Sequence, residues 1–256
     1  MPARPGGGGS AAAARFAVSY STPLHGTDPD RLIGYAQHAE ACGFEGLYVP
    51  EHVVLYPGAT VGAVEMPPSL PYADPLDLLT VGLGGLPGEA TAVGVDFRSR
   101  GRRADEAIDV LRLLWGGDAD GVSFHGEFFD FERVCSFPKP HGATALPIHV
   151  GGSSRAAARR VGLRGDGYFP GGLLTPDERA AQWKLARSVA TGAGRDPDAL
   201  EYTRWGSTEL SAQRVESYAA QGVTRIVVGS GADTLAEQRD DLSGFADRFG
   251  LRPPMG

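Results

Sequence analysis

The chain has 256 residues, 42% of them hydrophobic, which is enough for one sizeable core in one or two domains. Its formal net charge of −7 argues against nucleic acid or an anionic membrane surface as a partner, because both favour a basic protein face. No run of about 18 apolar residues occurs, so no membrane-spanning helix is predicted.

The first fifteen residues, MPARPGGGGSAAAAR, are of low complexity and lack the apolar stretch of a secretory signal. We interpret residues 1–15 as a flexible tail and residues 16–256 as a single domain. Beyond the tail, short apolar runs alternate with amphipathic helical patterns. We expect strands at 16–20, 46–50, 147–150, 167–170, 200–205 and 224–229, and a remnant of one at 80–85.

Helical patterns follow most of these strands. The first helix has Asp28 as its cap and Gly43 as its stop, with an apolar face at Leu32, Ile33, Ala36 and Ala39. We expect further helices at 102–115, 154–163, 210–220 and 235–249, and one that opens with the capping box Thr175–Glu178. In the helix at 102–115, Asp105 and Glu106 are expected to pair with the arginines of the same segment.

Strand–helix alternation of this kind predicts an α/β fold with a parallel sheet, of the (β/α)8 TIM-barrel type. The count is one unit short, because residues 53–74 are rich in proline and glycine and leave room for a loop only. We therefore expect an incomplete barrel whose third strand and its helix are missing.

In such a barrel, chemistry belongs at the carboxyl ends of the strands. The segment Gly151, Gly152, Ser153 and Ser154 follows one strand and opens a helix, so it is a candidate anion cradle. Either serine is able to cap that helix. The alternative is a tight turn that binds nothing. GSGAD at 229–233 is a weaker candidate, because Asp233 would repel an anion.

Glu51 and His52 follow the second strand directly. Since an imidazole titrates near neutrality, His52 is a candidate proton donor over a pocket, the alternative being a surface pair at a loop entrance. His25, after the first strand, is placed to line the same mouth. We expect His149 in the core or at its rim, and assign structural roles to His38, His125 and His141.

Cys42 and Cys135 have no metal-ligand spacing, and we predict no metal site. They are expected to be small buried side chains in a reducing, cytoplasmic compartment, with one disulfide as the alternative.

The chain resembles the luciferase-like monooxygenase superfamily, and within it the oxidoreductases that use the deazaflavin coenzyme F420. The resemblance is carried, from about Phe16 to Phe249, by GFEGLYVPEH, DPLDLL, VGLGGLPGEATAVGVDFRSRGRRADEAIDVLRLLW, FPKPHGATALPIHVGGSSRAAARRVGLRGDGYFP and GVTRIVVG. An Arg-rich, Lys-poor composition is typical of a high-GC genome and favours F420 over the alternative, FMN.

This resemblance implies a (β/α) barrel with a flavin-type cofactor at its carboxyl-terminal face. The phosphate would lie on Gly151–Ser154, with Glu51 and His52 beside the reacting ring. Family members carry a third strand between DPLDLL and VGLGG, and here that segment is missing, with the join near Thr80–Val81.

Three functions remain open from the sequence. They are an F420-dependent oxidoreductase acting on a small organic molecule, a cofactor-poor remnant of such a barrel, and an unrelated phosphate-binding barrel enzyme such as an isomerase. The resemblance implies a homodimer as one expected assembly, and the sequence does not define the small-molecule substrate.

Overall fold

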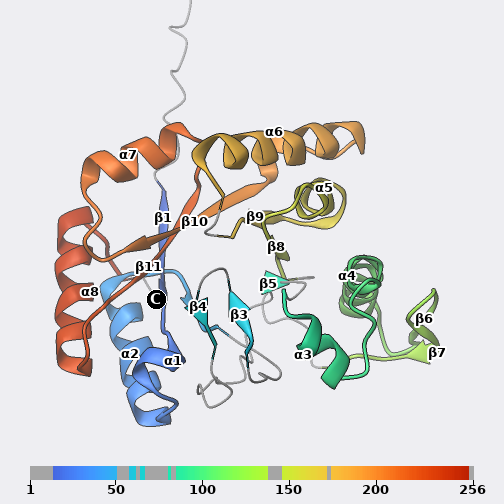
Figure 1. The fold of residues 1–256 in the computed structure, drawn as a ribbon, viewed down its shortest axis with the longest axis horizontal. Helices are drawn as coiled ribbons and strands as arrows, with labels where there is room; N and C mark the ends of the chain where they lie inside the picture. Colours follow the sequence, from blue (N-terminus) through green and yellow to red (C-terminus); the bar gives the residue numbers. More distant parts are fainter. Residues whose placement is uncertain are drawn as a thin grey trace, which may run out of the picture.

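The computed structural model describes residues 14–50, 58–61, 64–66, 80–81, 85–137, 146–171 and 174–253. Its centre is a curled sheet of seven strands, and each strand runs parallel to its neighbours (Figure 1). In order across the sheet they are β2 (Leu47–Tyr48), β1 (Arg15–Ser19), β11 (Arg225–Gly229), β10 (Glu201–Ser207), β9 (Gly167–Phe169), β8 (His149–Gly151) and β5 (Thr80–Val81).

Helices follow these strands along the chain and cover the outer face of the sheet. The longer ones are α2 (Pro29–Cys42), α4 (Arg100–Gly116), α5 (Arg155–Arg164), α6 (Pro176–Gly192), α7 (Ala212–Ala220) and α8 (Leu235–Phe249). The short ones are α1 (Thr22–His25), α3 (Pro87–Ala92) and the 3-10 turn η1 (Pro197–Ala199). The predicted α/β alternation is confirmed.

Strands β2 and β5 lie at the two edges of the sheet, and each pairs on one side only among the described strands. In a complete (β/α)8 barrel another strand would lie between them. In the described part of the chain between Tyr48 and Thr80, regular structure is limited to a small antiparallel pair, β3 (Thr60–Val61) and β4 (Val64–Glu65). The expected incomplete barrel is therefore confirmed, and the described residues of this segment contain no third strand of the main sheet and no helix.

The residues that begin and end α2, and those that begin α6, are the ones predicted from the sequence. The Asp28 carboxylate accepts hydrogen bonds from the N–H groups of Asp30 and Arg31, and Gly43 closes α2 with a φ of +91°. Thr175 and Glu178 form the predicted capping box at the start of α6. A second antiparallel hairpin, of β6 (Val122–His125) and β7 (Asp130–Val134), follows α4.

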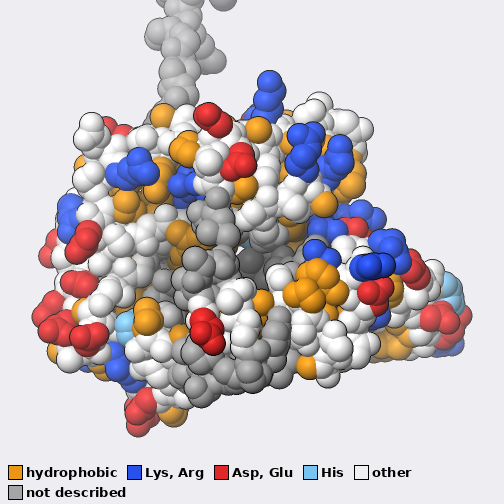
Figure 2. All heavy atoms as spheres, in the orientation of Figure 1, with side chains coloured by type: hydrophobic (Ala, Val, Ile, Leu, Met, Phe, Trp, Pro, Cys, Tyr) orange, Lys and Arg blue, Asp and Glu red, His pale blue; other side chains and the backbone are white. Residues whose placement is uncertain are grey.

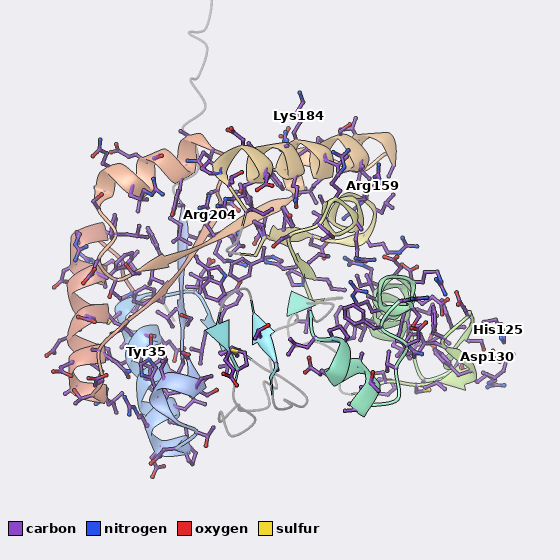
Figure 3. All side chains as sticks on the ribbon, in the orientation of Figure 1. Tyr35, His125, Asp130, Arg159, Lys184 and Arg204 are labelled. Atoms are coloured by element: carbon purple, nitrogen blue, oxygen red, sulfur yellow. The ribbon has the colours of Figure 1, made fainter. Side chains whose placement is uncertain are left out.

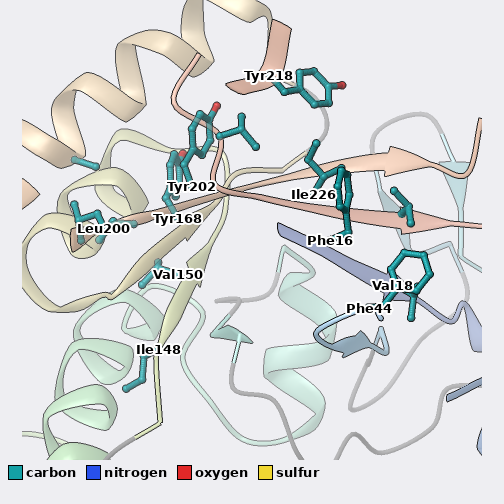
Figure 4. Close-up of a cluster of buried hydrophobic side chains, with 14 of the residues drawn as sticks. Phe16, Val18, Phe44, Ile148, Val150, Tyr168, Leu200, Tyr202, Tyr218 and Ile226 are labelled. Atoms are coloured by element: carbon teal, nitrogen blue, oxygen red, sulfur yellow. The ribbon is translucent and has the colours of Figure 1, made fainter. Parts of the chain in front are cut away.

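Side chains alternate between the two faces of each strand. Each face of the sheet carries a cluster of buried apolar side chains. The outer surface packs against the helices and forms the main core (Figure 4). Its strand residues include Phe16, Val18, Val150, Tyr168, Tyr202 and Ile226. The inner, concave surface carries a smaller cluster of Ala17, Tyr48, Phe169 and Val227.

Three expectations about single side chains are wrong. Ile33 is 52% exposed, because the buried side chains of α2 are Tyr35 and Ala39. Asp105 pairs with Arg160 on α5 rather than with a neighbouring arginine, and the Glu106 carboxylate accepts hydrogen bonds from the N–H groups of residues 127–129.

The cysteines also differ from the prediction in part. Cys42 and Cys135 are both free thiols, so the alternative of a disulfide is not realised. Cys42 is half-buried, with its Sγ 3.5 Å from Nε2 of His38, whereas Cys135 is exposed rather than buried.

Candidate functional site

The segment Gly151–Ser154 forms the corner between β8 and α5. Gly151 is the last residue of the strand, and Gly152 has a φ of +116°, a conformation that side-chain-bearing residues rarely adopt. A Cβ at Gly152 would also lie 3.3 Å from the Cβ of Ala157. Ser154, rather than Ser153, caps the helix, since its Oγ accepts a hydrogen bond from the N–H of Ala157 at 3.1 Å.

The carbonyl groups of this corner are held by buried side chains beneath it. The Tyr168 hydroxyl lies 3.1 Å from the oxygen of Gly152, and Nε2 of Gln182 donates to the oxygen of Ser153 at 2.7 Å. Tyr168 also contacts Oε1 of Gln182. Burial raises the pKa of Tyr168, so its hydroxyl keeps its proton. These contacts fix the orientation of two carbonyl groups at the corner.

Donors are available on the same corner. The first N–H groups of a helix have no partner within the helix, and they lie at the positive end of its dipole. The first turn of α5 contains no acidic residue that would compete for them. Ser153 and Ser154 are both exposed, so their hydroxyl groups are accessible from solvent. Gly151–Ser154 therefore has the chemistry of an anion cradle.

Arg179 of α6 adds a positive charge near this corner, which the sequence reasoning did not identify. Its guanidinium donates to the carbonyl oxygens of Gly171 and Leu174. Gly171 adjoins the cradle, because a Cβ there would clash with the Oγ of Ser153. The sequence did contain a signal for Arg179: it lies in the first turn of α6, the helix that follows β9, and β9 is the neighbour of β8 in the sheet.

At the second glycine-rich corner, residues 229–233, a carboxylate of the protein already occupies the positive end of the helix that follows. Helix α8 begins there with a capping box, in which the Glu237 carboxylate accepts from the hydroxyl and N–H of Thr234. These hydrogen bonds lower the pKa of Glu237 and keep it charged at the helix start. Ser230 in turn donates to Asp241 at 2.6 Å. Two carboxylates at this corner disfavour an anion, in line with the weaker ranking from sequence.

Aromatic side chains line the concave face of the sheet. Phe169 and Trp205 have ring centroids 4.6 Å apart, and Tyr48 meets Phe169 edge-on at 5.7 Å. Trp205 is 46% exposed, although it belongs to a central strand. Strand alternation places Trp205 on the inner face, but its exposure was not predicted from sequence.

The four described histidines differ in burial and in hydrogen-bond partners. His149 is buried within the sheet, as expected, with Nε2 3.1 Å from a Glu201 carboxylate oxygen. His25 lies after β1 and receives a hydrogen bond of 2.8 Å from Gln238, while burial lowers its pKa. His38 contacts the Arg239 carbonyl and Ser243, and exposed His125 pairs with Asp130.

The predicted catalytic pair, Glu51 and His52, lies outside the described residues, and so does His141. The strand that leads to the pair, β2, lies at one edge of the sheet beside β1. Within the described ranges, no group of three or more His, Cys, Asp or Glu side chains is placed to hold a metal ion. Nor does any described helix combine the length and apolarity that crossing a bilayer requires.

Residues 78–246 match the family model of luciferase-like monooxygenases. The chain therefore belongs to the luciferase-like monooxygenase family. Its fold agrees with this assignment: an F420-dependent secondary alcohol dehydrogenase, solved with an F420–acetone adduct, superimposes with a TM-score of 0.67 at 14% identity, over 93% of this chain and 98% of that one.

Curated relatives share more sequence over shorter stretches. An uncharacterized protein of Mycobacterium tuberculosis is 35% identical over 153 residues, which are 59% of this chain and 50% of the relative. The phthiodiolone/phenolphthiodiolone dimycocerosates ketoreductase of Mycobacterium sp. (strain JLS) is 30% identical over 190 residues, covering 71% of this chain and 47% of that one. The F420-dependent glucose-6-phosphate dehydrogenase of Nocardia farcinica is 31% identical over 113 residues, with shares of 41% and 31%. The chain thus spans about half the length, or less, of these curated relatives.

Proposed function

We propose that this chain is an oxidoreductase that binds coenzyme F420 and moves a hydride between it and a small organic molecule. FMN is the alternative cofactor. The proposal is supported by family membership, by the F420-dependent enzyme among the relatives, and by the cradle at Gly151–Ser154.

The observation that carries the proposal is the fit of the cradle to a phosphate. Gly152 leaves the backbone bare at the corner, α5 offers the N–H groups of its first turn other than the one that Ser154 caps, and Arg179 lies close by. The competing corner at 229–233 lacks this fit, because Glu237 and Asp241 occupy it with negative charge. The residues present therefore suit the anionic tail of a flavin-type cofactor.

A bound deazaflavin would supply the hydride donor or acceptor at its C5 atom. For the reacting end we keep the prediction from sequence: Glu51 and His52 lie beside the ring, and His52 donates a proton to the substrate or orients it. Trp205, which lies against the buried ring of Phe169, provides an accessible aromatic surface on the concave face, suited to a planar ring.

A direct test is titration of the purified chain with F420 and with FMN, followed by cofactor fluorescence. We expect saturable binding of F420, at least tenfold weaker in Gly152→Val, because the valine side chain would enter the space of the phosphate. Gly231→Val is the matched control. A Cβ at Gly231 meets nothing within 4 Å, and the residue belongs to the competing corner. Weakening by Gly231→Val alone would move the phosphate to 229–233 and contradict the assignment.

The catalytic prediction is tested separately. His52→Ala should lower turnover while leaving cofactor affinity nearly unchanged. If neither F420 nor FMN binds at high micromolar concentration, the chain is a cofactor-poor barrel remnant. Retention of a sugar phosphate without any flavin would instead indicate a phosphate-binding barrel enzyme of another class.

A further inference from the structure

A cavity of about 290 Å³ opens on the outer side of the sheet, between α6 and the end of α7. It is lined by Ala180, Trp183, Lys184, Arg187, Tyr202 and Gln221. Tyr202 is the second residue of β10, and Gln221 directly follows α7, so the cavity lies towards the amino ends of the strands. It shares no residue with the cradle, which follows the carboxyl end of β8.

Two aromatic rings form the apolar part of this cavity. The Trp183 and Tyr202 rings are stacked, with centroids 4.7 Å apart and planes inclined by 20°. Tyr202 is only 2% exposed, because its ring is stacked with both Trp183 and Tyr168, so the accessible aromatic surface is that of half-buried Trp183. Burial raises the pKa of the Tyr202 hydroxyl, which stays neutral. The small side chain of Ala180 leaves the space open. An aromatic surface of this kind favours a planar ring.

Two cations flank the rings. Arg187 is held in place, since its guanidinium donates to the Pro197 carbonyl at 2.9 Å and pairs with Asp198 at 2.6 Å. Lys184 is exposed, and no carboxylate in the described part of the chain lies within ion-pair distance of it. Figure 3 shows Lys184 projecting outward from α6, and Figure 2 shows Lys and Arg side chains gathered at the top right of the molecule.

We propose that this cavity is a second ligand site, which binds a planar aromatic carboxylate or phosphate. The ring would pack against the accessible part of Trp183, which Tyr202 supports from beneath, and the anionic group would meet Lys184. Its volume lies near the lower end of ligand pockets, about 300–1,000 Å³, so a single substituted ring fits better than a larger molecule. The proposal goes beyond the proposed function and does not depend on it, because neither F420 nor the cradle takes part.

The test uses the full chain without cofactor and follows the indole N–H signals of its three tryptophans by NMR. Benzoate and phenyl phosphate are the two probes, and benzyl alcohol is the uncharged comparison. Each is titrated to about 10 mM, above the millimolar range expected for so small a ligand. The Trp183 signal is identified by its loss in Trp183→Phe.

We expect both anions to shift the Trp183 signal saturably, and benzyl alcohol to bind more weakly. Ala180→Leu should abolish the shift by filling the cavity, and Lys184→Gln should weaken anion binding by about twofold to fivefold. Arg159→Gln, which removes an exposed cation on α5 outside the cavity, should change nothing (Figure 3). A stronger response to one anion identifies the preferred group.

The proposal is overturned if the Trp183 signal does not move with either anion, or if Ala180→Leu leaves the shift intact. Equal affinity for benzyl alcohol and the anions, or equal losses in Lys184→Gln and Arg159→Gln, would refute the role of Lys184.

Discussion

Nε2 of His149 lies 3.1 Å from Oε2 of Glu201, on two strands that both flank β9. The same carboxylate is paired with Arg15 and lies 2.9 Å from Nη1 of Arg225, which in turn pairs with Glu45. The inner face of the sheet thus carries a charge network near the amino ends of its strands. Burial alone would raise the pKa of Glu201, but contacts with His149 and Arg15 and the charge of Arg225 lower it to about 2.

The first prediction concerns acid stability and Glu201→Gln. Because folding lowers the pKa of Glu201 from 4.5 to about 2, the ionised carboxylate stabilises the fold above pH 4.5, and this stabilisation is lost as the pH falls towards 2. The variant should be less stable than the wild type by about 3 kcal/mol at most at pH 7, and this difference should shrink below pH 4.5. Urea unfolding at several pH values measures it. A difference that stays constant from pH 7 to pH 3 would contradict the network.

The second prediction concerns the support of the cradle. Tyr168→Phe removes the hydroxyl that contacts the Gly152 carbonyl and Gln182 in a fully buried setting. We expect a loss of about 1–3 kcal/mol in the free energy of unfolding, since buried polar groups are left without a partner. Tyr48→Phe is the control, because the hydroxyl of Tyr48 meets Arg225 only at 3.4 Å. If the proposed function is correct, F420 affinity falls in the first variant only. Equal stability losses in the two variants would argue against a special role of Tyr168.

The third prediction compares two ion pairs between α4 and α5. Arg160 is 5% exposed and its Nε lies 2.6 Å from Asp105, whereas the pair of Arg164 with Asp109 is more open, at 3.0 Å. Asp105→Ala leaves a buried cation without its partner and should cost about 3 kcal/mol. Asp109→Ala should cost less than about 1 kcal/mol. Chemical denaturation of both variants provides the comparison, and the reverse order would refute it.

The fourth prediction compares two glycines in opposite settings. Gly43 has a φ of +91°, and a Cβ there would clash with the backbone carbonyl of Arg252. Gly43→Ala should therefore destabilise the chain by more than about 1 kcal/mol. Gly244 is exposed within α8, and a Cβ there would meet nothing within 4 Å, so Gly244→Ala should stabilise by about 0.5–1 kcal/mol. Thermal unfolding of the pair gives opposite shifts if both environments are as described.

Features set by neighbouring residues were predictable from sequence. The Asp28 cap, the Gly43 stop and the Thr175–Glu178 box depend on contacts within a few positions, which propensities describe well. The missing barrel unit was also predictable, because a strand and helix require a minimum length that the loop-rich segment after β2 does not leave. The anion cradle was identified as a candidate for the same local reason.

Features that depend on contacts between distant segments of the chain could not be predicted from the sequence. Asp105 pairs with a residue 55 positions away, so no local pattern distinguishes Arg160 from the arginines beside it. The exposure of Ile33 depends on how α2 is rotated against the sheet. The position of Arg179 depends on how α6 packs against α5.

The unclosed sheet has a consequence for the way the molecule opens. In a closed barrel the strands form a ring, and every strand is hydrogen-bonded on both sides. Here the described strands form a row with two ends, β2 and β5, each two residues long. Backbone amide protons at these ends exchange with solvent first, and protection rises inward to β11 and β10, so local unfolding advances from the rim to the centre.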